Sequence, residues 1–364
     1  MCYYKSQVAN YEQLAEHYNA SFEAITDEID FYRAKFEEKL LKDDVLKSIG
    51  SGDSDLLGAQ LIKYSQKDLA PADLTKSELT ELRWYQRFLS AYGSDTTFHR
   101  YYENGFDLFP THIITSGEPD KFKLFKWGMV PGFTQTADEA IDNGRKWLNC
   151  RSEDMWETKP FRDAVKNSQR CLIPITGFFE WHTLDEDRTN KDKIKIPYHV
   201  TFSDRKIRSI GGIYTRWKNP SNGEFYYSYS ILTCPANPIL DYVHNSAKRM
   251  PVFIDQVNEK EWLNRDLKKD DVDALCKTSL DPTMVAYTIS KYLTSKNTNL
   301  NVPVVLSPFN YNQAIQEAYQ YLQKGEKKKA LEAFKNSVNF DKATEEHLKL
   351  AASENIKPEL TLLS

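Results

Sequence analysis

A cysteine directly follows the initiator methionine, in the opening stretch MCYYKSQVAN. Removal of Met1 would leave Cys2 with a free α-amine and a thiol on adjacent carbons. Reference pKa values are about 7.7–8.0 for such an amine and about 8.5 for the thiol, so part of each group is nucleophilic near neutral pH. The amine can condense with an aldehyde to give an imine, and the thiolate can then close a five-membered thiazolidine. Taken alone, the position of Cys2 is also explained by chance.

Two acid–base candidates lie far from Cys2 in the sequence. Glu180 stands in GFFEWH, where burial among aromatic rings would raise its pKa toward that of a general acid. Strand alternation would instead point Glu180 to solvent while the aromatic side chains pack, and this stretch alone favours exposure. His244 follows the apolar turn ILDYVH and is either a proton shuttle or a structural histidine.

The polar segment WLNCRSE, residues 147–153, offers further polar groups. Arg151 suits the binding of a phosphate, and Asn149 suits the orientation of a nucleophile. Both residues also suit ordinary turn chemistry. We expect Cys150, which lies between them, to be a buried neighbour.

Composition limits the class of protein. The chain has 364 residues, 40% hydrophobic and 13% aromatic, enough for a core in one large or two smaller domains. Its net charge of −4 means that a nucleic-acid site must be a local basic patch. Five cysteines without CxxC spacing argue against disulfides and zinc, and we expect neither a metal nor a cofactor. With no secretory signal or membrane span recognised, we expect a free Cys2 thiol in the reducing cytoplasm.

The apolar pattern divides the chain into three parts. Residues 10–100 predict helices over YEQLAEHYNASFEAITDEIDFYRAKFEEKLL and LTKSELTELRWYQRFLSAYG. From about residue 109, strands are predicted at THIITS, KLFKWGMV, RCLIPITGFFEWH, IPYHVTF, RSIGGIYTRW, EFYYSYSILT, RMPVFI, MVAYTIS and VPVVL. Residues 311–353 predict a tetratricopeptide-like helical hairpin that packs on the core or on a partner. Many strands without alternating helices predict an α+β fold with an antiparallel, barrel-like core.

The order Cys2, WGMVPGF, NCRSE, RCLIPITGFFEW, ILTCPAN and HNSAKRMPV resembles the SOS response-associated peptidase (SRAP) family. The resemblance covers Cys2 and roughly residues 100–310. It implies a β-rich SRAP domain over 1–310, with a helical insertion at about 10–100, followed by a helical extension at 311–364. It also implies a DNA-damage protein that captures abasic sites in single-stranded DNA through a thiazolidine link to the N-terminal cysteine. Self-processing by a hydrolase-type peptidase reaction would remove Met1, and abasic-site lyase activity is a further expectation.

The resemblance implies catalytic roles for four residues. Cys2 would be the nucleophile through its amine and its thiol, and Asn149 would hold the amine. Glu180 would move protons during opening of the sugar ring and closure of the adduct. His244 would assist as an acid–base group and polarise the sugar oxygen.

A positively charged groove is implied for the DNA. Arg151 would clamp a backbone phosphate, and four other side chains would shape or line the groove: Trp127, Phe133, Thr233 and Arg249. Single-stranded DNA with abasic sites is thus the expected partner of a monomer, and a replication-associated protein is a second expected partner. The basic residues expected near the motifs are Arg145, Lys146, Arg151, Lys159, Arg162, Lys166, Arg170, Lys248 and Arg249.

The chain departs from the family pattern in the groove. Tyr4 stands where the family usually has an arginine, which puts one phosphate contact in doubt. Phe133 and Thr134 replace a tryptophan pair, which weakens a stacking platform worth about 1–3 kcal/mol per base in single-strand binders. The segment NGFDLFP, residues 104–110, replaces the usual RYN-x-AP.

Two other classes of function account for part of the sequence. An N-terminal-nucleophile amidohydrolase would use Cys2 but gives no reason for NCRSE or RMPV, and turnover of amides without DNA would favour it. A non-catalytic scaffold would place the functional surfaces on residues 10–100 or 311–353. The scaffold predicts that Cys2→Ala changes no activity.

Overall fold

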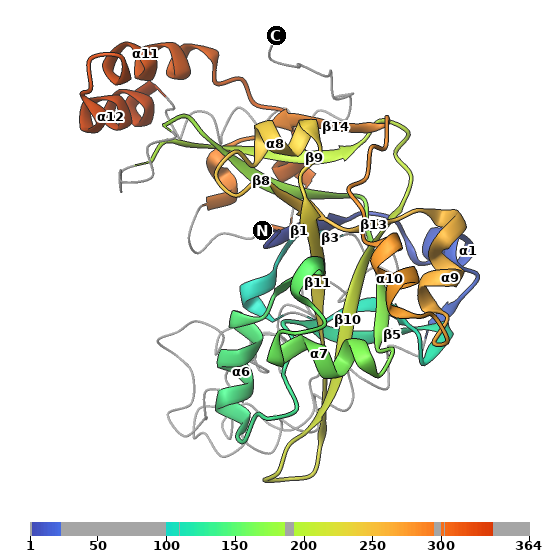
Figure 1. Cartoon of the computed structure of the whole chain (residues 1–364). Helices are drawn as coiled ribbons and strands as arrows, with labels where there is room; N and C mark the ends of the chain where they lie inside the picture. The colour runs from blue at the N-terminus through green and yellow to red at the C-terminus, as the bar shows by residue number, and fades with distance from the viewer. Residues whose placement is uncertain are drawn as a thin grey trace, which may run out of the picture.

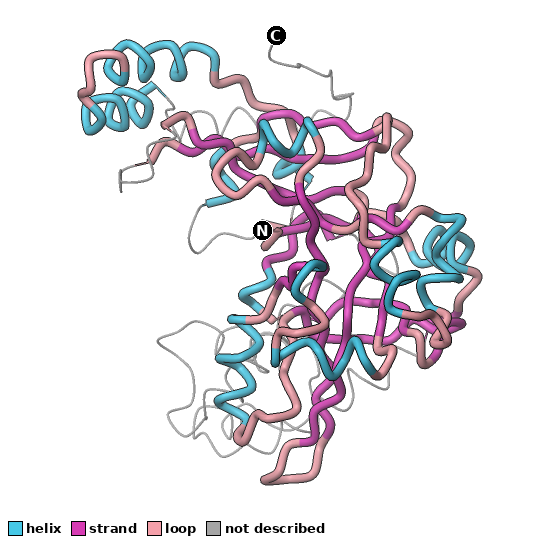
Figure 2. Tube along the Cα trace, in the orientation of Figure 1, coloured by secondary structure: helices cyan, strands magenta, loops and turns pink. Residues whose placement is uncertain are grey.

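The computed structural model describes residues 2–22, 100–108, 110–185, 193–294, 300–301 and 303–337. Two β-sheets meet at the centre, and short helices lie outside them (Figure 1, Figure 2). The strands are β1 (Tyr4–Gln7), β2 (Ser21–Phe22), β3 (Arg100–Asn104), β4 (Pro110–Thr115), β5 (Glu118–Trp127), β6 (Asn149–Arg151), β7 (Arg170–Ile175), β8 (Gly177–Thr183), β9 (Lys195–Phe202), β10 (Arg208–Lys218), β11 (Phe225–Pro235), β12 (Arg249–Pro251), β13 (Phe253–Ile254) and β14 (Met284–Thr288). The α-helices are α1 (Tyr11–Tyr18), α6 (Ala137–Lys146), α7 (Lys159–Lys166), α8 (Pro238–Val243), α9 (Glu259–Leu263), α10 (Lys269–Leu275), α11 (Asn312–Leu322) and α12 (Lys327–Ser337).

Five strands of the larger sheet close into a barrel. They pair in the order β11, β10, β7, β4 and β5, and β5 pairs back onto β11. The closing pair is parallel, with Ser228 opposite Lys126 and Tyr229 opposite Trp127, and the other four pairs are antiparallel. Closure removes the free edges of this part of the sheet. The predicted α+β fold with an antiparallel, barrel-like core is therefore confirmed.

The run RCLIPITGFFEWH forms two strands in different sheets. All six residues of β7 are buried, as a continuous apolar run requires, and α9 covers this strand through a hydrogen bond from Trp262 Nε1 to the Cys171 carbonyl at 2.9 Å. After Thr176, β8 enters the smaller sheet, whose order is β14-β9-β8-β1-β3. A Cβ at Gly177 would lie 2.3 Å from His199 Nε2, so glycine allows β8 and β9 to approach.

Strand β1 carries a buried ion cluster into the smaller sheet. Lys5 is 1% exposed and pairs with Glu103 of β3, and the other oxygen of Glu103 lies 3.0 Å from Arg100 Nε. Burial lowers the pKa of Lys5, while the Glu103 carboxylate opposes that shift. Loss of one member of a buried ion pair typically costs about 3–5 kcal/mol. The cluster therefore fixes β1 with Lys5 opposite Glu103.

Two predicted elements are wrong in the described residues. Helix α1 begins at a capping box of Asn10 and Gln13 but ends at Tyr18, because Asn19 adopts a left-handed φ of 48° and β2 follows. The strand predicted at VPVVL is instead a 3-10 turn over Pro303–Leu306. Proline cannot donate to a β-ladder. The helix predicted over LTKSELTELRWYQRFLSAYG lies outside the described residues.

The predicted C-terminal hairpin is present as α11 and α12, at the upper left of Figure 1. Ala318, Ala330 and Phe334 are fully buried and belong to the main hydrophobic cluster. The Tyr311 hydroxyl donates to the Ile289 carbonyl at 2.8 Å, so the hairpin is tied to the residues that follow β14. The division into domains at 310 and 311 stays a prediction.

Gly128 provides a test of the packing beside WGMVPGF. Its φ is +130°, and a Cβ would lie 2.5 Å from Leu108 Cδ2 and 2.6 Å from the Gly144 carbonyl oxygen. We expect Gly128→Ala to lower the free energy of unfolding by about 2 kcal/mol or more, because backbone strain and overpacking each cost roughly 1–3 kcal/mol. Gly132→Ala is the control, since its Cβ would meet nothing within 4 Å. Equal denaturation midpoints for the two variants, followed by tryptophan fluorescence, would contradict this expectation.

Candidate active site

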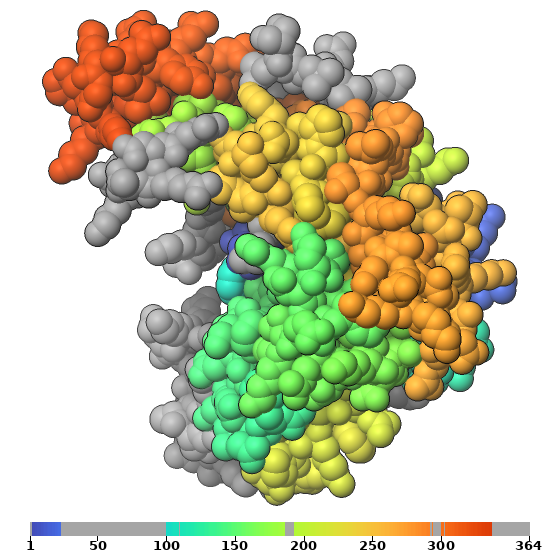
Figure 3. Space-filling view, in the orientation of Figure 1, coloured from blue at the N-terminus to red at the C-terminus, as the bar shows by residue number. Residues whose placement is uncertain are grey.

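Cys2 is buried just before strand β1. In the space-filling view, the blue N-terminal residues are visible between the green segment below and the yellow and orange segments above (Figure 3). The Cys2 side chain is 1% exposed, and its Sγ lies 3.5 Å from the Tyr4 carbonyl oxygen. Burial raises the pKa of the Cys2 thiol far above its usual range, and Glu180 raises it further. The thiol is therefore protonated at neutral pH and needs a base before it can act as a nucleophile.

Glu180 is buried, which corrects the expectation of a solvent-exposed carboxylate. Glu180 is 4% exposed and lies in the middle of β8, a strand with buried residues on both of its faces. Burial raises the pKa of Glu180 to about 8. Glu180 Oε1 has no hydrogen-bond partner among the described residues. A protonated carboxyl group with a free oxygen can give a proton to a ligand.

His244 faces Glu180 from the C-terminal end of α8. Its Nε2 lies 3.6 Å from Glu180 Oε2, and its Nδ1 lies 3.0 Å from the Arg249 carbonyl oxygen. That carbonyl can only accept a hydrogen bond, so Nδ1 carries the proton and Nε2 is the acceptor. Burial lowers the pKa of His244 to about 4. The separation of 3.6 Å between His244 Nε2 and Glu180 Oε2 would allow an ion pair. Because the pKa of Glu180 is raised and the pKa of His244 is lowered, both groups are neutral at pH 7, with Glu180 protonated.

The loop after α8 is fastened to β8 by a side-chain amide. Asn245 Oδ1 accepts from the Thr183 amide at 3.0 Å, and Asn245 Nδ2 donates to the Thr183 carbonyl at 2.8 Å. These two bonds hold His244 beside the strand that carries Glu180. Asn245 was not singled out from the sequence, although it lies in HNSAKRMPV.

The side-chain amide of Asn149 makes no hydrogen bond to the described residues. It begins β6, which pairs in parallel with β11 through Ile231. Both polar side-chain atoms of Asn149 are shielded from solvent and lack a hydrogen-bond partner among the described residues. An unsatisfied buried polar group costs about 1–3 kcal/mol, so such a group calls for a functional explanation. The preceding residue, Leu148, lies close to Gly105, whose amide donates to the Tyr3 carbonyl at 2.9 Å.

The side chains predicted to bind DNA fall into two groups. Arg151 is exposed, and the Phe133 ring is 38% exposed with Lys159 Nζ at 4.6 Å from its centroid. Trp127 and Thr233 are 1% and 0% exposed, so they support the wall of the site from within. Tyr4 packs edge-on against Trp181 at 4.9 Å, in a small aromatic cluster, and supplies no cation.

Arg249 is held by the carboxylate of Glu153, which was not predicted as a site residue. Glu153 of NCRSE accepts two hydrogen bonds from the Arg249 guanidinium, at 2.5 and 2.8 Å. Arg249 also donates to the Thr233 carbonyl at 2.6 Å. The bidentate pair neutralises the guanidinium and fixes the backbone carbonyl that orients His244. The signal that could have indicated this pair is that Glu153 and Arg249 both lie in the motif segments quoted above.

The expected basic patch is smaller in the structure than in the sequence. Arg170 is 1% exposed and donates to the Trp262 carbonyl at 2.8 Å, so it stabilises the core. Lys248 pairs with Asp241, and Arg162 pairs with Asp163. Only part of the predicted set is therefore available to a polyanion.

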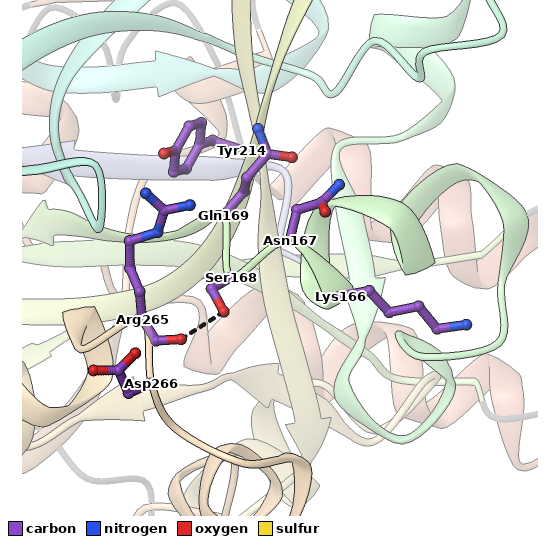
Figure 4. Close-up of a pocket in the computed structure, with 7 residues that line it drawn as sticks. All are labelled: Lys166, Asn167, Ser168, Gln169, Tyr214, Arg265 and Asp266. Atoms are coloured by element: carbon purple, nitrogen blue, oxygen red, sulfur yellow. Dashed lines mark hydrogen bonds between the residues drawn. The ribbon is translucent and has the colours of Figure 1, made fainter.

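A separate pocket of about 740 Å³ lies where the end of α7 meets the loop after α9. Its lining is polar, and the Ser168 hydroxyl donates to the Arg265 carbonyl across it (Figure 4). None of the four predicted catalytic residues lines it. Within the described ranges no cluster of His, Cys, Asp or Glu is arranged to hold a metal ion. None of the helices in those ranges combines the length and apolar character needed to cross a bilayer.

The protonation of Glu180 predicts a pH-dependent stability. Its folded pKa of about 8 exceeds the value of 4.5 for an unperturbed glutamate, so its stabilising contribution is complete below pH 4.5 and is lost as pH rises through 8. Relative to wild type, Glu180→Gln should therefore gain stability between pH 5 and 8, by up to a few kcal/mol at about 1.4 kcal/mol per pKa unit. Urea denaturation at several pH values measures the difference.

Glu153→Gln is the matched control for this measurement. Its hydrogen bond from Arg249 lowers the pKa of Glu153, so the Glu153 contribution is present at high pH and is lost on acidification. The stability difference for Glu153→Gln should therefore have the opposite sign of pH dependence. A difference for Glu180→Gln that does not change with pH would contradict a neutral, buried carboxyl group.

Comparison with known proteins gives a consistent set of relatives. The family model described as SOS response associated peptidase (SRAP) matches residues 75–296. The abasic site processing protein YoqW of Bacillus subtilis is 32% identical over 188 residues, which cover 51% of this chain and 77% of YoqW. The abasic site processing protein HMCES of Xenopus tropicalis is 25% identical over 157 residues, which cover 38% of this chain and 44% of HMCES.

A solved structure supports the same fold. The crystal structure of a protein from Bacteroides thetaiotaomicron is 29% identical to this chain and superposes with a TM-score of 0.53. The match covers 69% of this chain and 96% of that protein. Much of the fold of this chain is thus shared with a solved protein of related sequence.

Proposed function

The chain belongs to the SOS response-associated peptidase (SRAP) family, and we propose on that basis that it processes abasic sites by capturing them covalently at Cys2 in single-stranded DNA. The observation that carries the proposal is the buried, protonated Glu180 beside Cys2, with His244 at 3.6 Å. These groups come from distant parts of the chain. Their convergence suits a reaction that needs both a nucleophile and a mobile proton.

The reaction requires that Met1 be removed first, by hydrolysis of the Met1–Cys2 peptide bond. The free α-amine of Cys2 then attacks C1 of the ring-opened deoxyribose. Glu180 gives its proton to the departing hydroxyl, which leaves as water, and an imine forms. The thiol then transfers its proton to the Glu180 carboxylate, and sulfur adds to the imine carbon to close the thiazolidine. The net change is aldehyde plus aminothiol to thiazolidine plus water.

The remaining polar groups fit supporting roles in this scheme. Asn149, whose amide atoms lack partners among the described residues, would hold the α-amine for attack. His244 presents its unprotonated Nε2 and would polarise the sugar oxygen through Glu180 or a bound water. Arg151 is exposed and would take a phosphate, with Phe133 available for stacking. Removal of Met1 by the protein itself, lyase activity, a replication-associated partner, monomeric action and residence in the cytoplasm stay predictions.

Covalent capture is tested with an oligonucleotide that carries a natural abasic site. The intact mass of the purified protein must first show that Met1 is absent. We expect a denaturant-resistant protein–DNA adduct with wild type and none with Cys2→Ala. Cys2→Ala and Cys2→Ser both keep the α-amine without the thiol, so either variant should form a product only when borohydride traps the imine. A wild-type protein that forms no adduct would refute the proposal, and amide turnover without DNA would favour an amidohydrolase.

The pKa of Glu180 also predicts the pH dependence of capture. The acid form of Glu180 is lost as pH rises through about 8, whereas the amine becomes nucleophilic as pH rises through about 7.7–8.0. Adduct formation should therefore peak near pH 8. Glu180→Gln should slow it by roughly 10²–10⁴-fold and remove the decline at high pH. Single-turnover rates at several pH values measure this, and an unchanged profile in the variant would exclude Glu180 as the acid.

A further inference from the structure

An aromatic pair lies directly beside Cys2 and has no role in the scheme above. The rings of Tyr3 and Phe106 are 5.0 Å apart at 35°. The Gly105 amide donates to the Tyr3 carbonyl at 2.9 Å, so the turn that carries Phe106 continues the pairing of β1 with β3. The Phe106 side chain is 39% exposed. A single exposed phenylalanine needs no explanation, but this one is paired with the residue next to the nucleophile.

The backbone of Phe106 is fixed on both sides. Its amide donates to Asn104 Oδ1 at 3.1 Å, and its carbonyl accepts from Arg145 Nε at 3.3 Å. Gly105 is required before it, because a Cβ there would lie 3.0 Å from Leu148 Cδ2 and 3.1 Å from a ring carbon of Trp127. The ring is therefore held in its exposed position by a rigid turn. Such preorganisation lowers the entropic cost of binding a flat ligand.

Tyr3 lies on the same face of the smaller sheet as Glu180. In the antiparallel pairing of β1 with β8, Tyr4 is opposite Phe179, which puts Tyr3 opposite Glu180 one residue further along. Opposite residues in such a pair project to the same side. Burial raises the pKa of the Tyr3 phenol, and Glu180 raises it further, in agreement with this placement. Tyr3 and Phe106 thus border the proposed site of capture.

We propose that Tyr3 and Phe106 form a platform that stacks on the nucleobase flanking the abasic nucleotide. An abasic nucleotide lacks a base, so one face of the neighbouring base has lost its stacking partner. A sugar captured at Cys2 would bring that uncovered face to the adjacent aromatic pair. Because purines offer more surface than pyrimidines, the platform favours a purine at this flank. This inference rests on the proposed function and identifies a determinant of its sequence context.

A fluorescent base beside a stable abasic analogue tests the platform. The probe is a single-stranded oligonucleotide with tetrahydrofuran at the abasic position and 2-aminopurine on its 5′ or 3′ side. Tetrahydrofuran has no aldehyde, so binding is measured without the covalent step. We expect wild type to quench 2-aminopurine on one side, and Phe106→Ala to abolish the quenching and weaken affinity by about 5- to 150-fold. Phe106→Tyr should restore both.

Phe225→Ala is the matched control. Phe225 is a phenylalanine of similar exposure, 45%, with Arg216 at 4.4 Å from its ring, and it lies at the β10–β11 hairpin. This variant should bind and quench as wild type does. Absence of binding or quenching by wild type, or unchanged binding and quenching in Phe106→Ala, would overturn the platform. Because the adduct test uses natural abasic DNA, failure of covalent capture and failure of the platform give separate results.

Discussion

The position of β1 controls the rest of the site. Lys5 can stay charged inside the smaller sheet only where the Glu103 carboxylate meets it, and a one-residue slip would turn every β1 side chain to the other face. The ion cluster therefore fixes the register of β1 at Lys5, three residues after Cys2. Strand β8 pairs with the same strand from the other side and brings Glu180 to it. The relative placement of Cys2 and Glu180 thus depends on one buried ion pair.

The protonation states of Glu180 and His244 follow from their burial more than from their proximity to each other. Glu180 and His244 are both shielded from water, and each favours its neutral form there. Arg249 and Glu153 lie nearer the surface and stay ionised, because two short hydrogen bonds compensate for their partial desolvation. Glu180 and His244 therefore form a neutral pair inside the site, and Glu153 and Arg249 form an ionised pair nearer the surface. The hydrogen bond from His244 Nδ1 to the Arg249 carbonyl connects the two pairs.

The sequence predicts the local elements better than their long-range contacts. Strand runs such as MVAYTIS and the C-terminal hairpin were predicted, because apolar period and composition are local properties. The burial of Glu180 was not predictable, because an expectation of alternation assumes one exposed face, whereas both faces of β8 are covered by distant parts of the chain. The burial of the Asn149 amide was not predictable either, because it follows from the pairing of β6 with β11, a strand that lies far away in the chain. The helix predicted from Tyr11 extended beyond the observed end of α1 at Tyr18, because Asn19 is a weak stop signal within an otherwise helical pattern.

The distance along the chain between Cys2 and its partners matters during synthesis. More than 240 residues separate Cys2 from His244. At roughly 5–20 residues per second, a ribosome needs about 12–50 s to supply them. During that interval the growing chain carries Cys2 near its start but lacks the later segment that places His244 beside Glu180. Closure of β5 onto β11 pairs Trp127 with Tyr229, so the barrel can be completed only late, shortly before His244 is made.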